Sequence, residues 1–250
     1  MTKIGIRVFP DNIEKVSKLE ADYFEAAVRP GNDLSPYNII KEKILGIHGA
    51  ILMQECNFMN PLRKKLGTND KSLTSAIEAA DKFHVQYIIF HPGYIERGVY
   101  GERCNLRQLY STMNQIKDSR LLLEIVPVFA YKERNIFPLH SVDDYKHLKE
   151  KTGKNIMLDI GHAMINARAM KYDPIQYIGN LIEELDIKIM HIADNDERKD
   201  GYEDSHLSIG KGNVPIEEIL KQFKSKIELA TIEVNQISNK DIELVRKYLE

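Results

Sequence analysis

Six acidic or histidine side chains stand at the ends of short apolar runs along the chain. The runs read LGI, IIF, LLL, IML, KIM and ATI, of which KIM is the least apolar because it begins with lysine. Carboxylates and imidazoles gathered in one buried pocket would repel one another or lack partners, and divalent cations resolve that problem. Mixed ligands of this kind suit zinc, with manganese or iron also possible. The six residues are His48, His91, Glu124, Asp159, His191 and Glu233.

Two short motifs add further potential metal ligands. The stretch DIGH (159–162) places a histidine just after one of the apolar runs, and DSHLSIGKG (204–212) opens with an acid and a histidine two positions apart. The two glycines of the second motif would shape the turn that brings the loop back. We interpret the added side chains as a three-ligand site beside the other six. They are His162, Asp204 and His206.

The apolar runs that precede these residues have the character of parallel β-strands. Most are continuously apolar, as expected for strands that are buried on both faces. Eight such runs in alternation with helical patterns predict an α/β fold, a (β/α)8 TIM barrel, in which the strand ends converge on one pocket. The predicted strands span residues 3–9, 22–28, 44–50, 86–91, 120–126, 155–160, 187–192 and 228–234.

Helical spacing of apolar residues fills the intervals between several of these strands. We predict helices over 70–83, 173–185, 214–224 and 238–249. The longest loops, over 51–69, 127–140 and 193–213, leave the same ends of their strands, which marks that face as the substrate-binding one. The length of 250 residues is usual for one such barrel, and no linker interrupts it, so we expect a single domain over 1–250.

Composition narrows the classes of function. The chain is 43% hydrophobic and 29% charged, as globular proteins are, and no apolar run approaches the roughly 20 residues that a membrane helix needs. The formal net charge of −2 gives no overall basic bias towards nucleic acid. Residues 97–107, RGVYGERCNLR, are the best local basic candidate. The sequence offers no sign of a membrane partner or of an obligate protein partner.

The N-terminus and the cysteines bear on the compartment. The chain starts at once with a strand-like run, so we expect no signal peptide. Cys56 and Cys104 are far apart and show no framework spacing, which favours reduced thiols and a cytoplasmic location.

Seven short motifs carry a resemblance to a known family. HGA, FHPG, LLLE, LDIGHA, MHIAD, DSHLSIGKGN and IEVN occur in that order between about residues 44 and 235. In order and spacing they resemble the xylose isomerase-like barrel superfamily, and within it the endonuclease IV group (AP endonuclease family 2). The resemblance implies a zinc cluster of up to three ions and cleavage of the DNA phosphodiester on the 5′ side of an abasic site.

The resemblance also implies a role for each candidate ligand. His48 and His91 would hold one zinc ion, which Glu124 bridges to a second; Asp159, His191 and Glu233 would complete the second; and His162, Asp204 and His206 would hold the third. In that family the ions activate water for attack on phosphorus. Glu124 would then orient or deprotonate the nucleophile, so it is a catalytic candidate together with Glu233.

Two alternatives remain open. The same superfamily contains sugar and sugar-phosphate isomerases and epimerases, in which one divalent ion is held by residues resembling Glu124, Asp159, His191 and Glu233. There the two glutamates shuttle a proton next to the carbonyl group. The third alternative is a non-catalytic barrel that binds a ligand or a metal.

Overall fold

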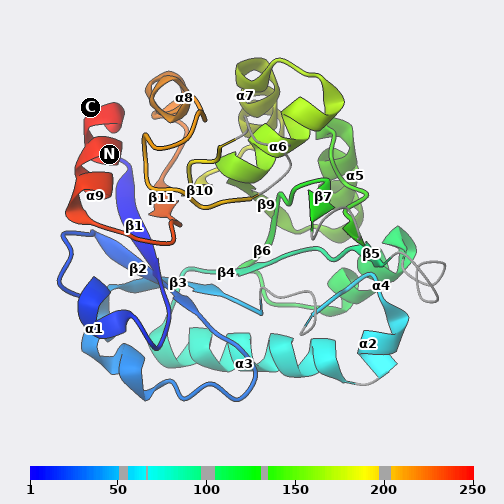
Figure 1. Ribbon diagram of the computed structural model, residues 1–250. Coiled ribbons are helices and arrows are strands. Elements are labelled where there is room, and N and C mark those ends of the chain that lie inside the picture. Colours follow the sequence, from blue (N-terminus) through cyan, green and yellow to red (C-terminus); the bar gives the residue numbers. More distant parts are fainter. Residues whose placement is uncertain (51–55, 66, 97–104, 131–134, 197–203) are drawn as a thin grey trace.

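The closed sheet at the centre of the molecule places all the predicted strands side by side. A computed structural model describes residues 1–50, 56–65, 67–96, 105–130, 135–196 and 204–250. Within these residues, eight strands pair in parallel in the cyclic order β1-β11-β10-β9-β6-β4-β3-β2 (Figure 1). They are β1 (Lys3–Val8), β2 (Tyr23–Ala27), β3 (Ile44–His48), β4 (Tyr87–Phe90), β6 (Leu121–Glu124), β9 (Asn155–Asp159), β10 (Ile189–Ile192) and β11 (Leu229–Ile232).

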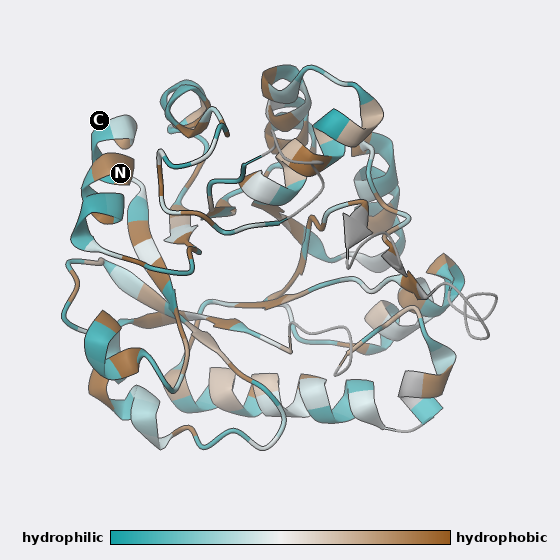
Figure 2. Ribbon diagram, in the orientation of Figure 1, coloured by the Kyte–Doolittle hydropathy of each residue, from teal (hydrophilic) through white to brown (hydrophobic). Residues whose placement is uncertain are grey.

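Helices surround the strands (Figure 1). They are α1 (Ile13–Val16), the 3₁₀ helix η1 (Ser35–Lys43), α2 (Pro61–Lys65), α3 (Thr68–Phe83), α4 (Leu106–Gln115), α5 (Val142–Thr152), α6 (Ile160–Met170), α7 (Pro174–Leu185), α8 (Ile216–Phe223) and α9 (Asn239–Leu249). Figure 2 shows hydrophilic and hydrophobic segments alternating along α3, as expected of a helix with one face on the sheet. The architecture is therefore the (β/α)8 barrel that the sequence predicts.

Local side-chain chemistry explains where several helices begin. The carboxylate of Asp173 accepts a hydrogen bond from the backbone N–H of Gln176, and Pro174 takes the first position of α7. Ser141 and Asp144 form a reciprocal capping box at the start of α5. Such caps satisfy backbone donors that have no partner within the helix, and they fix where the chain leaves each loop.

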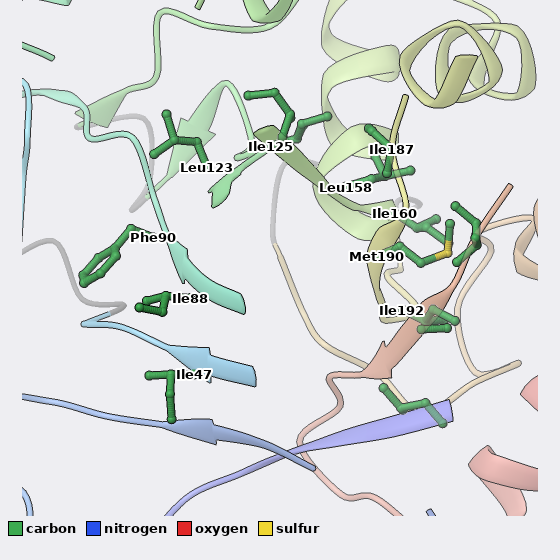
Figure 3. Packing of buried hydrophobic residues seen from close by; sticks show 14 of the residues in the cluster. Ile47, Ile88, Phe90, Leu123, Ile125, Leu158, Ile160, Ile187, Met190 and Ile192 are labelled. Carbon is green, nitrogen blue, oxygen red and sulfur yellow. The ribbon is translucent and has the colours of Figure 1, made fainter. Parts of the chain in front are cut away.

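Alternation along the strands divides the buried residues into two layers. One layer packs between strands and helices, and Figure 3 shows part of it, with Ile47, Ile88 and Leu123 contributed by neighbouring strands. The other layer fills the barrel interior. It contains Tyr23, Tyr87, Ile89, Leu122, Met157 and Leu229. Because successive side chains point to opposite faces, the residue after each outward apolar side chain points into the barrel.

Two glycines make room for the tyrosines of the interior. A Cβ atom on Gly46 would lie 2.1 Å from Cζ of Tyr87, and one on Gly5 would lie 2.3 Å from Cζ of Tyr23. No real Cβ contact is so close, so the rings occupy the space that the missing side chains leave. The tyrosine hydroxyls thereby reach the polar centre of the barrel.

The predicted elements agree with the structure to within a few residues. All eight strand predictions are confirmed, and the helices predicted over 70–83, 173–185, 214–224 and 238–249 correspond to α3, α7, α8 and α9. The loop predictions were incomplete. Residues 51–69 include α2, and residues 127–140 include β7 (Phe129–Ala130) and β8 (Asn135–Ile136), which form an antiparallel sheet with β5 (Ile95–Glu96). Two-residue strands exist only through their partners, so no periodicity reveals them.

The structure does not describe every residue on which a sequence prediction was made. Most of the basic stretch 97–107 lies outside them, as does Cys104, so the structure tests neither the nucleic-acid candidate nor the state of that thiol. No helix in the described part of the chain combines the length and apolarity needed to cross a membrane.

Candidate metal centre

The candidate ligands gather where the parallel strands end. His48, Glu124 and Asp159 are the last residues of β3, β6 and β9, and His191 lies in β10, one residue before its end. His91 and Glu233 directly follow β4 and β11. Parallel register brings these ends together: His191 pairs with Asp159 across β10 and β9, and His48 pairs with Ile89 across β3 and β4. The convergence of strand ends expected from the sequence is therefore present in the barrel.

Four buried atoms of this set face one another without hydrogen bonds among the described residues. They are Oε1 of Glu124, Oδ2 of Asp159, Nδ1 of His191 and Oε2 of Glu233. His191 Nδ1 lies 2.8 Å from Glu233 Oε2, 3.6 Å from Glu124 Oε1 and 3.9 Å from Asp159 Oδ2. Buried polar atoms are nearly always satisfied, and a cation would satisfy those of Glu124, His191 and Glu233, whose ligand atoms lie within 4.8 Å of one another.

The three distances from His191 Nδ1 are of the size expected between two ligands of one zinc ion. Zinc bonds of about 2.0–2.1 Å to nitrogen and oxygen place tetrahedral ligands about 3.3 Å apart. The spacing around His191 Nδ1 brackets that value. Asp159 is prepared for such a role because its Oδ1 caps α6 by accepting from the backbone N–H of His162 at 2.8 Å, which leaves Oδ2 for a metal.

A second group surrounds the carboxylate of Asp204. Its Oδ2 lies 3.0 Å from Nε2 of His162 and 2.7 Å from Nε2 of His206, while Oδ1 is buried without a hydrogen bond in the described residues. The ligand atoms of these three residues lie within 4.8 Å of one another, close enough to hold one ion. The structure therefore assembles the three residues that the two motifs predicted, although they are separated by up to 44 positions (206 − 162).

Glu124 contacts His48 and His91 with one carboxylate oxygen and lies near His191 with the other. Its Oε2 lies 3.1 Å from Nε2 of His48 and 3.1 Å from Nε2 of His91. Its other oxygen, Oε1, belongs to the four unpaired atoms and lies 3.3 Å from Nδ1 of His162. One carboxylate thus faces two clusters of potential ligands.

The electrostatics of the metal-free protein show how the charges balance. Burial raises the pKa of Asp159 to about 6, and the neighbouring carboxylates add to the rise. Burial alone would lower the pKa of His206, but the hydrogen bond with Asp204 and the charge of Glu233 raise it to about 9. Burial is likewise outweighed at His191, where Glu25 and Glu233 raise the pKa well above its usual value. Protonated histidines therefore balance the negative charge of the carboxylates, as divalent cations would if they were bound.

Two polar residues after β10 position the loop that carries Asp204 and His206. Oδ2 of Asp194 accepts from the backbone N–H groups of Gly210 and Gly212, each at 2.9 Å, and Oδ1 of Asn195 accepts from the backbone N–H of Ser205 at 2.9 Å. Asn195 also accepts from the backbone N–H of His206 at 3.2 Å.

Backbone strain occurs at His206, at the ligand end of this loop. His206 has a φ of 45°, a left-handed conformation that a histidine seldom adopts, and its Nδ1 lies 2.9 Å from the backbone oxygen of Glu233. The fold holds this ring in a conformation that the local sequence disfavours, which is common at functional sites.

Sequence reasoning missed two charged residues of the site, Arg7 and Glu25. Arg7 forms an ion pair with Oε1 of Glu233, and its side chain is only 9% exposed. Glu25 is fully buried and contacts His191. The available signal was a single charge inside an apolar strand run, KIGIRVF for Arg7 and DYFEAAV for Glu25. Only the closed barrel shows which way those charges point.

Known proteins provide an independent comparison. A family model described as xylose isomerase-like TIM barrel matches residues 13–247. The chain is 26% identical over 264 aligned positions to the uncharacterized protein MJ1311 of Methanocaldococcus jannaschii, over 96% of this chain and 84% of that protein. This relative carries no activity in its name.

Solved structures include similar barrels with different activities. A D-tagatose 3-epimerase-like protein has a TM-score of 0.72 at 21% identity, covering 99% of this chain and 97% of its own. Endonuclease IV from Thermus thermophilus has a TM-score of 0.69 at 15% identity, covering 99% of this chain and 98% of its own. At such identities the likeness shows the fold alone, so the chemistry has to be argued from the side chains.

Proposed function

We propose that this chain, which belongs to the xylose isomerase-like TIM barrel family, is a metal-dependent phosphodiester hydrolase with a multinuclear zinc centre. Its site residues would be the nine candidate ligands, and DNA with an abasic site is the first substrate to test. Manganese or iron could occupy the same ligands.

The observation that carries this proposal is the group of His162, Asp204 and His206. A barrel that uses one ion would have enough ligands in the group of His48, Glu124, His191 and Glu233. The Asp204 group supplies a separate set, with an additional buried and unpaired carboxylate oxygen. One carboxylate oxygen of this partly buried group is itself buried and has no hydrogen bond, so the extra group supports more than one ion.

The residues of the chain have distinct parts in such a reaction. Bound divalent ions would lower the pKa of water and stabilise negative charge on a phosphoryl group. Glu124 faces both neighbouring clusters, so its carboxylate is placed to accept a proton from the attacking nucleophile or to orient it. Arg7 fixes Oε1 of Glu233 and leaves Oε2 directed at His191. The contacts of Asp194 and Asn195 with residues 205–214 would hold Asp204 and His206 in place.

Metal content and hydrolysis test the proposal together. If the nine candidate ligands hold a trinuclear centre, elemental analysis of the purified protein should find about three zinc ions per chain. The protein should cleave bis(p-nitrophenyl) phosphate and incise a duplex that contains an abasic site. Both activities should be lost on treatment with a chelator and return with zinc. A chain that is fully loaded with zinc but cleaves neither substrate would contradict the hydrolase assignment.

Isomerisation or epimerisation of a sugar or sugar phosphate is the second candidate. The observation in its favour is that Glu124 and Glu233 flank His191 within one compact group, as a pair of proton-transferring glutamates around one ion would. Incubation with ketoses and their phosphates in D₂O separates the two functions. Deuterium incorporated next to the carbonyl group, with about one ion per chain, would favour this second function over hydrolysis.

A further inference from the structure

A fully buried glutamate lies inside the barrel, beneath the candidate metal centre. Glu25 occupies the middle of β2, and its neighbours in register are Arg7 on β1 and Gly46 on β3. It is 0% exposed. An ionised carboxylate at such a place is costly unless specific donors surround it, so its partners indicate what it does.

The principal partner of Glu25 is the imidazole of His191. Nε2 of His191 lies 3.0 Å from Oε1 and 3.0 Å from Oε2 of Glu25. The hydroxyl of Tyr87 donates to Oε2 of Glu25 at 2.9 Å, and that of Thr231 donates at 3.5 Å. Both carboxylate oxygens are therefore engaged by donors, and the group has the surroundings of an ionised acceptor.

The opposite edge of the same ring faces the metal centre. Nδ1 of His191 is the nitrogen among the four unpaired atoms, 2.8 Å from Glu233 Oε2. Glu25 lies on the Nε2 side and belongs to none of the three groups of ligand atoms found in the described residues. The carboxylate and the metal centre thus hold opposite edges of one imidazole.

We infer that Glu25 is a positioning residue for the metal centre: it accepts the Nε2 proton of His191 and thereby presents the Nδ1 lone pair to the ion. Such an acceptor fixes the tautomer and the orientation of a ligand imidazole and raises its basicity. This inference rests on the proposed function only in taking His191 as a ligand.

Tyrosine and threonine hydroxyls in the barrel interior hold the carboxylate of Glu25 in place. Tyr87 reaches it because Gly46 has no side chain, and the hydroxyl of Tyr23 lies 2.7 Å from that of Thr231. These contacts support Glu25 but do not reach His191. A variant of Tyr87 therefore disturbs the same buried network without removing the contact on which the inference depends.

The test compares Glu25→Gln with Tyr87→Phe as its matched control. Glutamine keeps the shape of the side chain but removes the charge, so zinc affinity measured by chelator competition should fall about 10- to 100-fold. Tyr87→Phe should lose far less. If Glu25 had only a structural role, both variants would melt at lower temperature while folded molecules kept their affinity for zinc, and that result would overturn the inference.

A second measurement needs no variant. In the zinc-loaded protein, nitrogen-15 NMR of the histidine rings should show His191 protonated at Nε2 and bound to metal through Nδ1. Protonation at Nδ1 would overturn the inference even if Glu25→Gln failed to fold.

Failure of this inference is distinguishable from failure of the proposed function. Suppose that the wild-type protein binds zinc but hydrolyses no phosphodiester, and that Glu25→Gln binds zinc more weakly. These results would contradict the hydrolase function alone and would support the role of Glu25. Hydrolysis by a Glu25→Gln protein with unchanged zinc affinity would overturn the role of Glu25 alone.

Discussion

Asp204 places its Oδ2 atom 2.7 Å from Nε2 of His206, two residues further along the same loop. His206 reaches this position only through a left-handed backbone conformation, which Asn195 and the backbone of Glu233 hold in place. The same carboxylate oxygen also contacts His162 on α6. A loop and a helix that are distant in sequence therefore share one acceptor, which separates this barrel from one with a single group of ligands.

Removal of His206 should separate a multinuclear hydrolase from an enzyme with one ion. We predict that His206→Ala loses about one zinc ion per chain and at least about 100-fold in hydrolysis, since loss of a ligand should exceed the 10- to 100-fold effect of a residue that only supports one. Elemental analysis and a phosphodiesterase assay measure the two effects. His147→Ala, on the exposed side of α5, is the control and should change neither. A hydrolysis rate that survives in His206→Ala would exclude a role for this group.

The sequence was sufficient to predict the barrel because its strands are continuous apolar runs that end in polar residues. This pattern holds for β3, β4, β6, β9 and β11, and it also located the candidate ligands at their ends. The geometry of a (β/α)8 barrel then required those ends to converge. Roles within the cluster did not follow from the pattern alone, and the position of Glu124 between two groups of ligands was implied only by the resemblance to the endonuclease IV group.

Residues that act from within a strand could not be predicted in the same way. Arg7 and Glu25 interrupt apolar runs, and an isolated charge there has several explanations until the register is known. Asp194 ends the motif MHIAD and Asn195 follows it, but their role is to accept backbone N–H groups from residues 205–214. Such contacts depend on where the loop returns, and side-chain type alone does not determine that.

Zinc affinity should increase with pH. The pKa of His206, raised to about 9 in the metal-free protein, means that the ring carries a proton at neutral pH, and zinc binds only the neutral ring. A rise in pH from about 6.5 towards 9 removes the competing proton from His206, so the affinity for zinc should increase over this range. Chelator competition at several pH values measures the slope, and His206→Ala should have a shallower one. A slope that is the same in both proteins would contradict this assignment.

Removal of the ions should destabilise the fold. The site gathers carboxylate oxygens of Glu124, Asp159 and Glu233, and without metal only protons on the histidines offset their repulsion. Zinc at 100 times its dissociation constant should contribute about 2.7 kcal/mol to the free energy of unfolding. For a chain of this size that corresponds to a difference of about 5–10 °C in melting temperature. Calorimetry with and without a chelator tests the prediction, and restored zinc should restore the melting temperature. Equal melting temperatures would indicate that no ion binds at these ligands.

Two isosteric substitutions should remove metal ions from different parts of the site. Glu124→Gln removes the charge that faces His48, His91 and His162, so we expect it to lose the ions next to Glu124 and to keep the one at Asp204. Asp204→Asn should lose the ion between His162 and His206 and keep the others. Elemental analysis of both proteins gives the two stoichiometries. If each substitution removed all bound metal, the groups would act as one inseparable cluster.

The space that Gly46 provides for Tyr87 should be measurable as coupling between the two residues. A Cβ atom at position 46 would overlap the Tyr87 ring, so Gly46→Ala should lower the free energy of unfolding by about 1–3 kcal/mol. In Tyr87→Leu the ring is absent, and the same substitution at position 46 should cost much less. Chemical denaturation of both single variants and the double variant gives the coupling free energy. Strictly additive effects would show that the strands move apart to accept the methyl group. The position of Tyr87 next to Glu25 would then not depend on this glycine.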